Sequence, residues 1–503
     1  MMSELIKITK KNEVFGIIEC DSGIQLEIQD HFSFMVNGAR HMPKFKAGIW
    51  DGRIRLFNLV TKEFPLGLFN DLVEFCKARD YEIEYGDSPY GIPNEKNNIS
   101  AEAVQEFVNS LQCTGKDGKV LEIRDFQYVA VYEALLNKRK VLLASTGAGK
   151  SLIAYCIIRW LVESEMRVML VVPTKSLVLQ MLKDFVTYSQ ENEFDVEENT
   201  HIIMGGLEKK TKKSIVITTW QSIQKMPSEY FQQYDAVMVD EVHGAKGTML
   251  QGILSKCTES AHRIGMTGSL DNSEANSMLI KAMFGDITRV TSTKKLMDDG
   301  HLTPISIKAI LLDYSDETKE LCKKFDYQRE IDFICQHEKR NKFIRNLALS
   351  LDGNSLVLYN YVEKHGKVIY DLIKAKADPE RKIFFVHGGV EAEDREAIRH
   401  IVEENNNAII VASLGTFSTG ININRLHNVI FASPTKSVIR VLQSIGRGLR
   451  LSEDKKVFNL FDIADNLAKS TKKKNFTYKH LLERLSIYHK EDFQFKIIDV
   501  NLE

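Results

Sequence analysis

Short apolar runs, separated by longer amphipathic stretches, dominate the chain from about residue 120 onward. Up to about residue 300 the runs are Val141–Leu143, Val168–Val172, Ile215–Thr219, Ala236–Val239 and Arg263–Met266. Apolar runs that alternate with helical patterns are typical of parallel strands buried on both faces. From about 302 to 503 the alternation repeats, with expected strands at Leu356–Tyr359, Ile383–Val386, Ala408–Val411, Asn428–Phe431 and Val457–Leu460. The pattern predicts two α/β units in series, each with its own parallel sheet.

The first part of the chain has a different pattern. Up to about residue 85, strand-like runs at Glu13–Cys20, Ile24–Ile28 and Arg53–Leu59 alternate with a helix-like stretch at Leu68–Ala78, which predicts a small α+β module. The prolines and glycines of Gly86–Asn98 indicate a linker, and a short helix is expected at Ser100–Leu111. We therefore expect an N-terminal module with its linker at 1–98, a first α/β domain at 99–301, and a second at 302–503 that ends in a basic tail.

Composition sets limits on this picture. A chain of 503 residues exceeds one ordinary core, and 44% hydrophobic with 27% charged residues is typical of a globular protein. No apolar run approaches ~20 residues and the first residues lack the apolar segment of a secretory signal, so we expect a cytoplasmic protein. The seven cysteines never form C-x-x-C, which indicates reduced, mostly buried thiols. A net charge of −1 disfavours a passive nucleic-acid coat but leaves room for local basic patches.

Two basic clusters interrupt this even balance of charge. The first surrounds Trp50 and comprises Arg40, Lys44, Lys46, Arg53 and Arg55; the second comprises Lys469, Lys472, Lys473, Lys474 and Lys479. Asp51-Gly52 is a hairpin-turn signal, and a basic hairpin that carries a tryptophan suits stacking on a base or contacts with phosphates. We assign DNA contacts here to Lys46, Trp50, Arg53 and Arg55. A solvated hairpin whose Trp50 fills the small core is an equally good interpretation.

The expected strand at Val141–Leu143 leads into a glycine-rich turn, ASTGAGKS at 144–151, and then into a helical stretch. Backbone N–H groups of such a turn, here including Thr146, Gly147 and Gly149, face an anion at the start of a helix. Lys150 would reach the terminal phosphates and Ser151 would offer its hydroxyl to Mg²⁺. Ala144 replaces the glycine of the strict pattern, and a bare Gly-Lys-Ser/Thr triplet arises by chance in roughly a quarter of chains this long. The loop alone is therefore only suggestive.

An acidic pair follows another expected strand, Ala236–Val239. Phosphoryl transfer from a magnesium nucleotide needs a carboxylate on the metal side and a group that positions the attacking water. Asp240 would take the first role, and Glu241 would orient or deprotonate the water. Such a pair is common after strands, and it gains weight here because a phosphate loop and two strand–helix units precede it.

Two arginines in QSIGRGLR, residues 443–450, lie one helical turn apart. A mobile arginine can contribute ~10³–10⁵ in rate by stabilising charge on the γ-phosphate, which is the role we expect for Arg447 and Arg450. An ordinary surface helix is the alternative. Q-x-x-G-R-x-x-R arises by chance in about one chain in several hundred, and its place in the second unit predicts a nucleotide that closes the two units and releases them on hydrolysis.

The ordered set of motifs resembles that of superfamily 2 helicases. ASTGAGKS is similar to motif I, DEVH at 240–243 to motif II, MTGS at 266–269 to motif III and QSIGRGLR to motif VI. VVPTKSLVLQM at 171–181, ITTWQS at 217–222 and IIVASLGTFSTGIN at 409–422 resemble motif Ia, a second DNA-side motif and motif V. The resemblance covers about 120–465. It implies two tandem RecA-like parallel-sheet domains that form a helicase core, with ATP and Mg²⁺ as cofactors.

The same resemblance implies roles for further residues. Arg124 and Gln127, upstream of the phosphate loop, would bind adenine. His243, Thr267 and Ser269 would couple the nucleotide to DNA. Asn422 and Gln443 would act with Arg447 and Arg450 on the nucleotide from the second domain. Contacts with the DNA backbone would come from hydroxyls and an amide that hold register without reading bases, namely Thr174, Gln180, Thr219, Ser413 and Thr416.

Three further segments, FKAGIWDGRIRLFN at 45–58, TSTKKLMDDGHLT at 291–303 and FSTGININRLHNVI at 417–430, resemble the recombination and repair helicases of the T-even phages. That resemblance implies ATP-driven remodelling of branched DNA, including fork regression, Holliday-junction branch migration and R-loop unwinding, in phage recombination, repair and replication control. It also implies single-stranded DNA and phage recombination or single-strand-binding proteins as partners, within the cytoplasm of the infected bacterial host.

Two other classes of function stay open at this point. One is an ATP-gated clamp that holds DNA without moving along it; the motif III-like segment and the paired arginines favour the motor. The other is the motor subunit of a restriction system, although no nuclease pattern of an acidic pair with a lysine is found outside the motor, and Glu380-Arg381-Lys382 is too weak a match to count. An RNA helicase also stays open, although Q-x-x-G-R-x-x-R is closer, by family resemblance, to DNA translocases.

Overall fold

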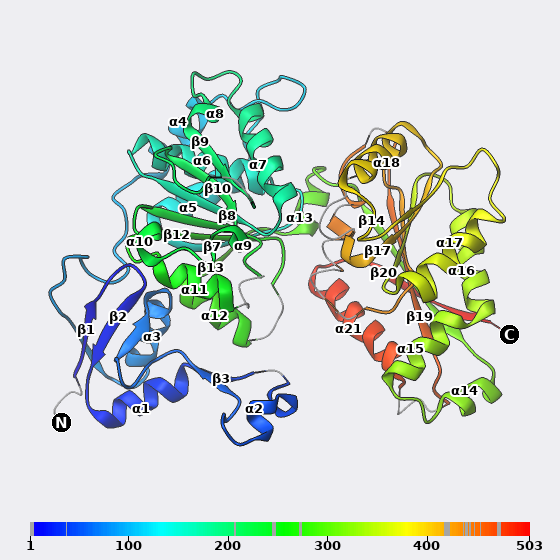
Figure 1. Cartoon of the computed structure of the whole chain (residues 1–503), viewed down its shortest axis with the longest axis horizontal. Coiled ribbons are helices and arrows are strands. Elements are labelled where there is room, and N and C mark those ends of the chain that lie inside the picture. The colour runs from blue at the N-terminus through cyan, green and yellow to red at the C-terminus, as the bar shows by residue number, and fades with distance from the viewer. Residues whose placement is uncertain are drawn as a thin grey trace. The chain divides into compact units, whose positions relative to one another are not determined.

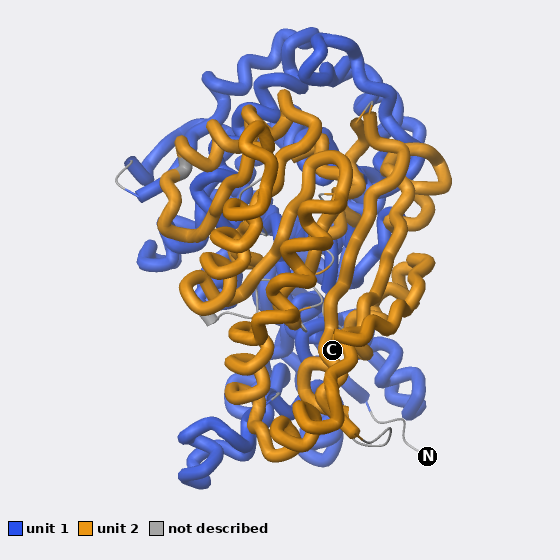
Figure 2. The backbone as a smooth tube through the Cα atoms, turned by 90° about the vertical axis from the view of Figure 1, so that its right-hand side faces the viewer, with its two compact units in different colours: residues 1–144, 148–291 blue, residues 145–147, 292–503 orange. Residues whose placement is uncertain are grey.

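The computed structural model divides the chain into two compact units, which Figure 2 distinguishes by colour. One comprises residues 1–144 and 148–291, and the other residues 145–147 and 292–503. The structure describes residues 5–36, 38–205, 208–243, 248–270, 274–416, 423–435, 437, 441, 444–446, 448–452, 454–469 and 474–502. Among the helices of these ranges, none has both the length and the apolar character that crossing a membrane requires.

A seven-stranded parallel sheet forms the centre of the first unit, with strand order β13-β7-β12-β11-β8-β10-β9. Its strands are β7 (Arg139–Ala144), β8 (Val168–Val172), β9 (Thr200–Ile203), β10 (Ile215–Thr219), β11 (Ala236–Asp240), β12 (His262–Thr267) and β13 (Ile287–Thr291). The helices are α4 (Ala101–Ser110), α5 (Asp125–Asn137), α6 (Lys150–Glu163), α7 (Lys175–Tyr188), α8 (Val196–Asn199), α9 (Trp220–Ile223), α10 (Ser228–Phe231), α11 (Thr248–Lys256) and α12 (Glu274–Phe284). Helices cover both faces of the sheet (Figure 1).

Strand β8 illustrates why the sheet is buried on both sides. Val168, Leu170 and Val172 pack into the core formed with α4 to α7, while Met169 and Val171 face the core formed with α9 to α12. Successive side chains of a strand point to opposite faces, so a strand covered twice must be apolar at every position. The uninterrupted apolar runs of the sequence follow directly from this arrangement.

The second unit contains another seven-stranded parallel sheet, in the order β16-β17-β15-β18-β19-β14-β20. Its strands are β14 (Ile305–Asp313), β15 (Ser355–Tyr359), β16 (Ile383–Val386), β17 (Ile409–Ser413), β18 (Asn428–Phe431), β19 (Phe458–Asn466) and β20 (Phe495–Asn501). Its helices are α13 (Thr293–Asp298), α14 (Asp316–Cys322), α15 (Tyr327–Gln336), α16 (Glu338–Ser350), α17 (Lys367–Lys374), α18 (Ala392–Glu404) and α21 (Phe476–Lys490), with a π-helical turn η4 (Val362–Gly366) before α17. The predicted α/β class, with two parallel sheets, is confirmed.

Strand β19 is longer than the predicted run Val457–Leu460 because two buried ion pairs let it continue through aspartates. Asp462 accepts hydrogen bonds from Arg484, with 2.8 Å between Nε and Oδ2, and Asp465 accepts from Arg340, with 2.7 Å between Nε and Oδ1. All four side chains are almost fully buried. An isolated buried carboxylate would be very costly, whereas a paired and hydrogen-bonded one is tolerated.

The N-terminal part of the first unit is an α+β module, as predicted. Its sheet has the order β5-β2-β1-β6 and a separate two-stranded ribbon joins β3 to β4; the strands are β1 (Leu5–Lys10), β2 (Phe15–Glu19), β3 (Ser33–Met35), β4 (Arg53–Arg55), β5 (Glu63–Pro65) and β6 (Glu82–Tyr85). The helical elements are α1 (Ser22–His31), η1 (Ala39–His41), α2 (Pro43–Lys46), η2 (Leu66–Leu68) and α3 (Phe69–Lys77).

The strand predicted at Ile24–Ile28 is wrong, since these residues lie in helix α1. Asp21 caps the helix by accepting a hydrogen bond from the Gly23 N–H at 2.7 Å. Ile24 and Ile28 are both buried, whereas Leu26 between them is 58% exposed. The alternation of apolar and polar residues suggested a strand, but only the two residues four apart face the core, as the helical period requires.

The basic hairpin also differs from the prediction. Its strands are β3 and β4, and Asp51-Gly52 directly precede β4 instead of forming a two-residue turn. The predicted strand to Leu59 ends at Arg55. Trp50 is half-buried and its indole N–H donates to the Arg53 carbonyl at 2.7 Å. Among the described side chains that pack on the module's core, Trp50 is absent, so it does not fill that core.

The module is anchored on the first parallel sheet and on α12 by ion pairs. Glu13 accepts hydrogen bonds from Lys10 at 2.7 Å and from Arg139 of β7 at 2.6 Å, and all three side chains are buried. Lys281 of α12 pairs with Asp71 of α3 at 2.5 Å. At Gly67 of η2, a Cβ would lie 2.0 Å from the Lys281 carbonyl oxygen, so only glycine allows this approach. Two ion pairs and one close backbone contact thus fix the module in place.

Residues 86–100, described throughout, contain neither helix nor strand but are held at several points. Ser88 Oγ donates to the Lys10 carbonyl, Lys10 Nζ donates to the Tyr90 carbonyl at 2.9 Å, and Asn97 Nδ2 donates to the Leu135 carbonyl at 2.7 Å. The connection is therefore a segment laid along the surface of the unit. Six of the seven cysteines are buried and Cys20 is half-buried.

Candidate active site

The phosphate loop joins β7 to α6, and its glycines adopt the conformations that the turn requires. Gly147 and Gly149 have φ angles of 88° and 79°, in the region that L-residues rarely occupy. A Cβ on Gly149 would lie 2.4 Å from Nε2 of Gln127. That amide donates to the Ala148 carbonyl at 2.9 Å, and its Oε1 accepts from the Arg124 N–H at 3.0 Å. Gln127 is buried and braces the loop, a role that its position in the sequence did not reveal.

Four of the predicted residues meet at the carboxyl ends of neighbouring strands β7, β12 and β11. Glu241 lies at the centre. Its Oε1 is 3.3 Å from Nζ of Lys150, and its Oε2 is 3.0 Å from Nδ1 of His243 and accepts from Oγ1 of Thr267 at 3.2 Å. Nδ1 of His243 also lies 3.1 Å from Oγ1 of Thr267. We call Lys150, Glu241, His243 and Thr267 the Glu241 cluster.

The acidic pair has two different environments. Burial raises the pKa of Asp240, and the neighbouring Glu241 charge raises it further. Burial acts on Glu241 in the same sense, but the Lys150 ammonium and the hydrogen bond from His243 outweigh it, so the pKa of Glu241 is lowered. Glu241 also has a φ of 56°, a strained value for a residue with a side chain. Glu241 is thus an ionised carboxylate held by donors, which is the form a base needs.

Ser151, the predicted magnesium ligand, has a partner that sequence reasoning missed. Its Oγ lies 2.8 Å from the hydroxyl oxygen of Tyr188, the last residue of α7. The same helix begins after Thr174, whose hydroxyl caps it by accepting from the Leu177 N–H at 3.3 Å. No local pattern links Tyr188 to the loop, because the contact depends on how α7 packs against α6. Helix α7 therefore joins a predicted DNA-contacting residue to the phosphate loop.

The oxygen groups beside the loop suit magnesium. A serine hydroxyl and a carboxylate are hard ligands, and Mg²⁺ is usually held by one or two carboxylates together with substrate phosphates and water. Within the described ranges no group of three or more His, Cys, Asp or Glu residues could hold a metal ion, and a magnesium–nucleotide site does not need one. Ser151 and Asp240 fit the ion; Asp240 is buried and its Oδ1 accepts from the Glu241 N–H at 3.0 Å.

Several predicted DNA-contacting hydroxyls are already hydrogen-bonded inside their own units. Oγ1 of Thr219 lies 2.9 Å from Oγ of Ser222, and Ser413 donates to Oγ1 of Thr416 at 2.7 Å. Thr219 and Thr416 are buried, while Gln180 is exposed on α7. Ser269 is buried, and its Oγ has no hydrogen-bond partner among the residues that the structure describes. These bonds lie in the turns after β10 and β17.

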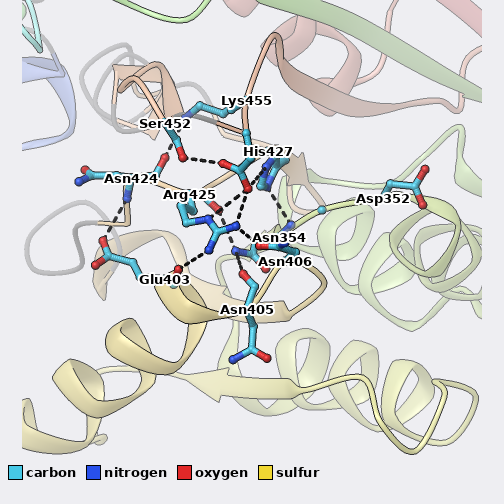
Figure 3. A network of polar contacts seen from close by, with 12 residues as sticks. Asp352, Asn354, Glu403, Asn405, Asn406, Asn424, Arg425, His427, Ser452 and Lys455 are labelled. Atoms are coloured by element: carbon cyan, nitrogen blue, oxygen red, sulfur yellow. Dashed lines mark hydrogen bonds and ion pairs between the residues drawn. The ribbon is translucent and has the colours of Figure 1, made fainter.

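The predicted residues of the second unit are described only in part. Asn422, Gln443 and Arg447 lie outside the described residues. Arg450 is described, and its carbonyl accepts from Oγ1 of Thr303 at 3.1 Å. Residues that follow the motif V-like and motif VI-like segments are joined by the network in Figure 3, which includes Asn354, Arg425 and Lys455. In the basic tail, Lys469 pairs with Glu320 at 3.0 Å, and Lys472 and Lys473 are outside the described residues.

In the N-terminal module, the basic residues differ in their exposure and in their ion pairs. Lys46 is exposed at the end of α2, and Arg55 is exposed but forms an ion pair with Asp51. Arg53 donates to Oγ of Ser33 at 2.6 Å. Hydrogen bonds to Asp51, chiefly from Arg55, hold the pKa of this carboxyl well below its usual range. Asp51 therefore neutralises part of the positive charge that the sequence places here.

Two parallel-sheet units, one carrying a phosphate loop beside an acidic pair, define a helicase core of the RecA-like kind. Family models match most of the chain: "DNA helicase UvsW, N-terminal" at residues 6–86, "Type III restriction enzyme, res subunit" at 97–272 and "Helicase conserved C-terminal domain" at 338–452. A solved structure of the "ATP-dependent Type ISP restriction-modification enzyme LlaBIII bound to DNA" matches 76% of this chain and 32% of that one, with a TM-score of 0.55 and 17% identity, which shows a shared fold alone.

The more specific likeness covers nearly the whole chain. The "ATP-dependent DNA helicase uvsW" of Enterobacteria phage T4 is 37% identical over 96% of this chain and 97% of its own length. The crystal structure of T4 UvsW matches 99% of this chain and 100% of its own, with a TM-score of 0.52 and 33% identity. The chain belongs to the UvsW family of DNA helicases.

Proposed function

We propose that this protein is an ATP-dependent DNA helicase and translocase that remodels branched DNA. Its reactions would include fork regression, Holliday-junction branch migration and R-loop unwinding in phage recombination, repair and replication control. The observation that carries the proposal is the Glu241 cluster, in which a phosphate-loop lysine, an ionised carboxylate, a histidine and a motif III threonine form one connected set. Such a set can relay the state of a phosphate to residues on the DNA side.

The nucleotide roles follow from the chemistry of the loop. Backbone N–H groups of Thr146, Gly147 and Gly149 and the Lys150 ammonium bind the phosphates. Arg124 and Gln127 take adenine; since Gln127 also holds the Ala148 carbonyl, base binding and loop conformation are linked.

Ser151 and Asp240 would hold Mg²⁺, which would neutralise charge on the phosphates when bound. Glu241 accepts a proton from the attacking water or orients it, a role that its ionised state allows. Nζ of Lys150 lies 3.3 Å from Oε1 of Glu241, so the lysine that contacts the phosphates in this proposal is also a partner of the catalytic carboxylate. His243, Thr267 and Ser269 then pass the change on.

Four residues of the second domain act on the nucleotide during hydrolysis in this proposal, namely Asn422, Gln443, Arg447 and Arg450. Arginine side chains suit this task because they stay charged and can contribute ~10³–10⁵ in rate at a γ-phosphate. In this proposal residues 99–301 and 302–503 are the two motor domains, and residues 1–98 are a DNA-binding module with its connecting segment.

DNA is held by groups that contact its backbone, which suits a motor that acts on any sequence. The proposed contacts are Thr174, Gln180, Thr219, Ser413 and Thr416 in the motor and Lys46, Trp50, Arg53 and Arg55 in the module. Single-stranded DNA and branched junctions are the proposed substrates, with phage recombination or single-strand-binding proteins as further partners. The proposed place of action is the cytoplasm of the infected bacterial host, where the phage genome is processed.

The restriction-motor alternative has less support. Its weak nuclease pattern includes Arg381, which donates to the carbonyls of Leu349 and Leu351 at 2.8 and 2.9 Å and so stabilises the fold. The clamp alternative differs from the motor in one measurable property, because a clamp hydrolyses ATP without displacing strands.

Lys150→Ala tests the nucleotide site, and Lys140→Ala is its matched control. Lys140 is a half-buried lysine of the same unit that pairs with Glu133 at 3.2 Å, away from the loop. We expect Lys150→Ala to abolish DNA-stimulated ATPase while binding to forked DNA persists, and Lys140→Ala to retain both. Unchanged hydrolysis in Lys150→Ala would refute the site assignment.

The substrate class is tested by ATPase and strand displacement on single strand, duplex, fork, four-way junction and R-loop. Branched substrates should be preferred, and affinity should fall steeply with salt because phosphate contacts dominate. Hydrolysis without strand displacement on every substrate would favour the clamp.

A further inference from the structure

A buried lysine in the second unit joins two segments that flank functional motifs. Lys455 is 6% exposed, and its ammonium donates to the Asn424 carbonyl at 2.8 Å and to the Gly448 carbonyl at 2.9 Å. Asn424 lies two residues after Asn422 of the motif V-like segment. Gly448 lies between the two arginines of the motif VI-like segment. One side chain thus joins the backbone just after the motif V-like segment to the backbone of the motif VI-like segment. Figure 3 shows Lys455 together with Asn424 and Arg425.

The neighbouring residues repeat this connection with a second charged contact. Arg425 donates to Oδ2 of Asp454 from Nε at 3.1 Å and from Nη2 at 2.7 Å, and Ser452 donates to Oδ1 of the same carboxylate at 2.6 Å. Arg425 also donates to the Glu403 carbonyl at 2.8 Å. Asp454 and Lys455 therefore contact Arg425 and Asn424, respectively, so two adjacent contacts set the distance and the register between these two segments.

Asn354 holds the same segment from beneath. This fully buried amide donates to the carbonyls of Val402, Asn405 and Arg425 at 2.7–2.9 Å and accepts from the Ala408 N–H at 2.9 Å. The segment after motif V is thereby attached to the end of α18 and the start of β17. Its position cannot drift independently of the sheet.

Stability alone does not explain a lysine at position 455. Burial lowers the pKa of its ammonium to about 8, the sign of a charge that is costly to bury. An apolar side chain of similar length would avoid that cost, and replacing buried charges by apolar residues is often neutral or stabilising. What an apolar residue cannot do is hold two carbonyl oxygens of different segments at hydrogen-bond distance. The geometry points to a positioning role.

We propose that Lys455 is a positioning residue that holds the segment starting at Ile423 and the residues Gly448–Arg450 in one fixed arrangement, so that the motif V-like and motif VI-like segments act on the nucleotide together. The proposal rests on the proposed function, because it assigns these residues to ATP hydrolysis. Gly448 supports it: a Cβ there would lie 2.1 Å from the Phe458 ring, so the turn is packed directly against β19. The bond from Lys455 to the Gly448 carbonyl adds to this packing and links the turn to Asn424.

The test compares Lys455→Met with Lys319→Met. Lys319 is another lysine of the second unit with a mostly buried side chain, 2.9 Å from the carboxylate of Asp313 and outside the motifs. Misplacing a catalytic group by about 1 Å can cost ~10²-fold in rate. We expect Lys455→Met to lower kcat of DNA-stimulated ATPase by about 10- to 100-fold while KM for ATP changes by less than about threefold. Lys319→Met should stay within about twofold of the original protein in both constants.

A purely structural role gives a different result. Lys455→Met would then lower the thermal unfolding temperature, and kcat would fall only in proportion to the folded fraction. Equal loss in both variants, or an unchanged kcat in Lys455→Met, overturns the proposal. If Lys455→Met does not fold, Lys455→Gln keeps one amide donor for one of the two carbonyls. Its kcat should then lie between the lysine protein and complete loss, and a kcat equal to the lysine protein overturns the proposal.

Failure of the proposed function would look different from failure of this inference. If the unmodified protein shows no DNA-stimulated ATPase, or if Lys150→Ala retains it, the proposed function fails. If the unmodified protein is active, Lys150→Ala is inactive and Lys455→Met is fully active, only the positioning role fails.

Discussion

Glu13→Gln should release the N-terminal module from the first motor unit. Glu13 is the only described carboxylate within salt-bridge distance of Arg139, and it also pairs with Lys10. Removing its charge leaves two buried cations without a counter-ion. Loss of one partner of a buried pair costs ~3–5 kcal/mol. Glutamine keeps an oxygen acceptor, and the Glu13 carbonyl also accepts from Arg139 at 2.6 Å. We therefore expect a loss of free energy at the lower end of this range, about 3 kcal/mol.

That free energy corresponds to about a hundredfold larger population of the open module, at ~1.4 kcal/mol per factor of ten. Limited proteolysis of residues 86–98 measures this population, since cleavage of a transiently opened segment follows the open fraction when reclosing is fast. We expect cleavage about a hundredfold faster in Glu13→Gln. Binding to forked DNA should weaken more than ATPase on single strands, because only the module's contacts are displaced.

Glu84→Gln is the matched control. Glu84 pairs with Lys7 in the same module at 3.8 Å, but both side chains are about half exposed, and such pairs contribute less than about 1 kcal/mol. Its cleavage rate should differ little from that of the unmodified protein. If Glu13→Gln and Glu84→Gln were cleaved at equal rates, the buried pair would not be what anchors the module.

Three further outcomes are expected. Tyr188→Phe removes only the hydroxyl beside Ser151, and it should weaken the binding of a fluorescent nucleotide several-fold with Mg²⁺ but not in EDTA. Tyr155→Phe, whose ring contacts that of Tyr188, is the control and should change neither affinity. Equal effects of both variants would contradict a role of the Tyr188 hydroxyl. Burial lowers the pKa of His262 to about 4, so between pH 6.5 and 4 the unfolded chain binds a proton that the folded chain does not. The free energy of unfolding should therefore fall on acidification below pH 6.5, by about 2 kcal/mol at pH 5. In His262→Gln the free energy of unfolding should depend less on pH. Asp465→Asn leaves the buried Arg340 without its counter-ion and should lower the unfolding free energy in urea by about 3–5 kcal/mol, with an unchanged midpoint as the contrary result.

The amount of the fold that the sequence predicts depends on how far each signal reaches along the chain. Strands β8, β10, β16 and β18 match the predicted runs. In β8, β10 and β18 every side chain is buried, and burial on both faces favours a mostly apolar run that marks the strand locally. Strands β9, β13, β14 and β20 were missed. Strand β20 lies at the sheet edge with mostly exposed side chains, so burial imposes no apolar run on it.

The sequence pattern gave wrong strand bounds where polar residues inside a strand are stabilised by partners far along the chain. The predicted strand before Asp462 and Asp465 ended early, since only Arg484 and Arg340, far along the chain, make those aspartates tolerable in a core. In α1 the exposed Leu26, between Ile24 and Ile28, gave the apolar alternation that is typical of a strand. Only the packing of the module shows which of these apolar residues face the core.

The sequence alone determined the phosphate loop, the acidic pair and the order of the motifs, because each is a short segment whose chemistry resides in adjacent residues. The tertiary structure decided how they are held. Tyr188 meets Ser151, Gln127 braces Ala148, and Lys455 spans two motif segments through contacts between residues that the chain separates. A side chain's partners are set by the packing of helices and strands, and that packing is a property of the whole core, not of any local pattern.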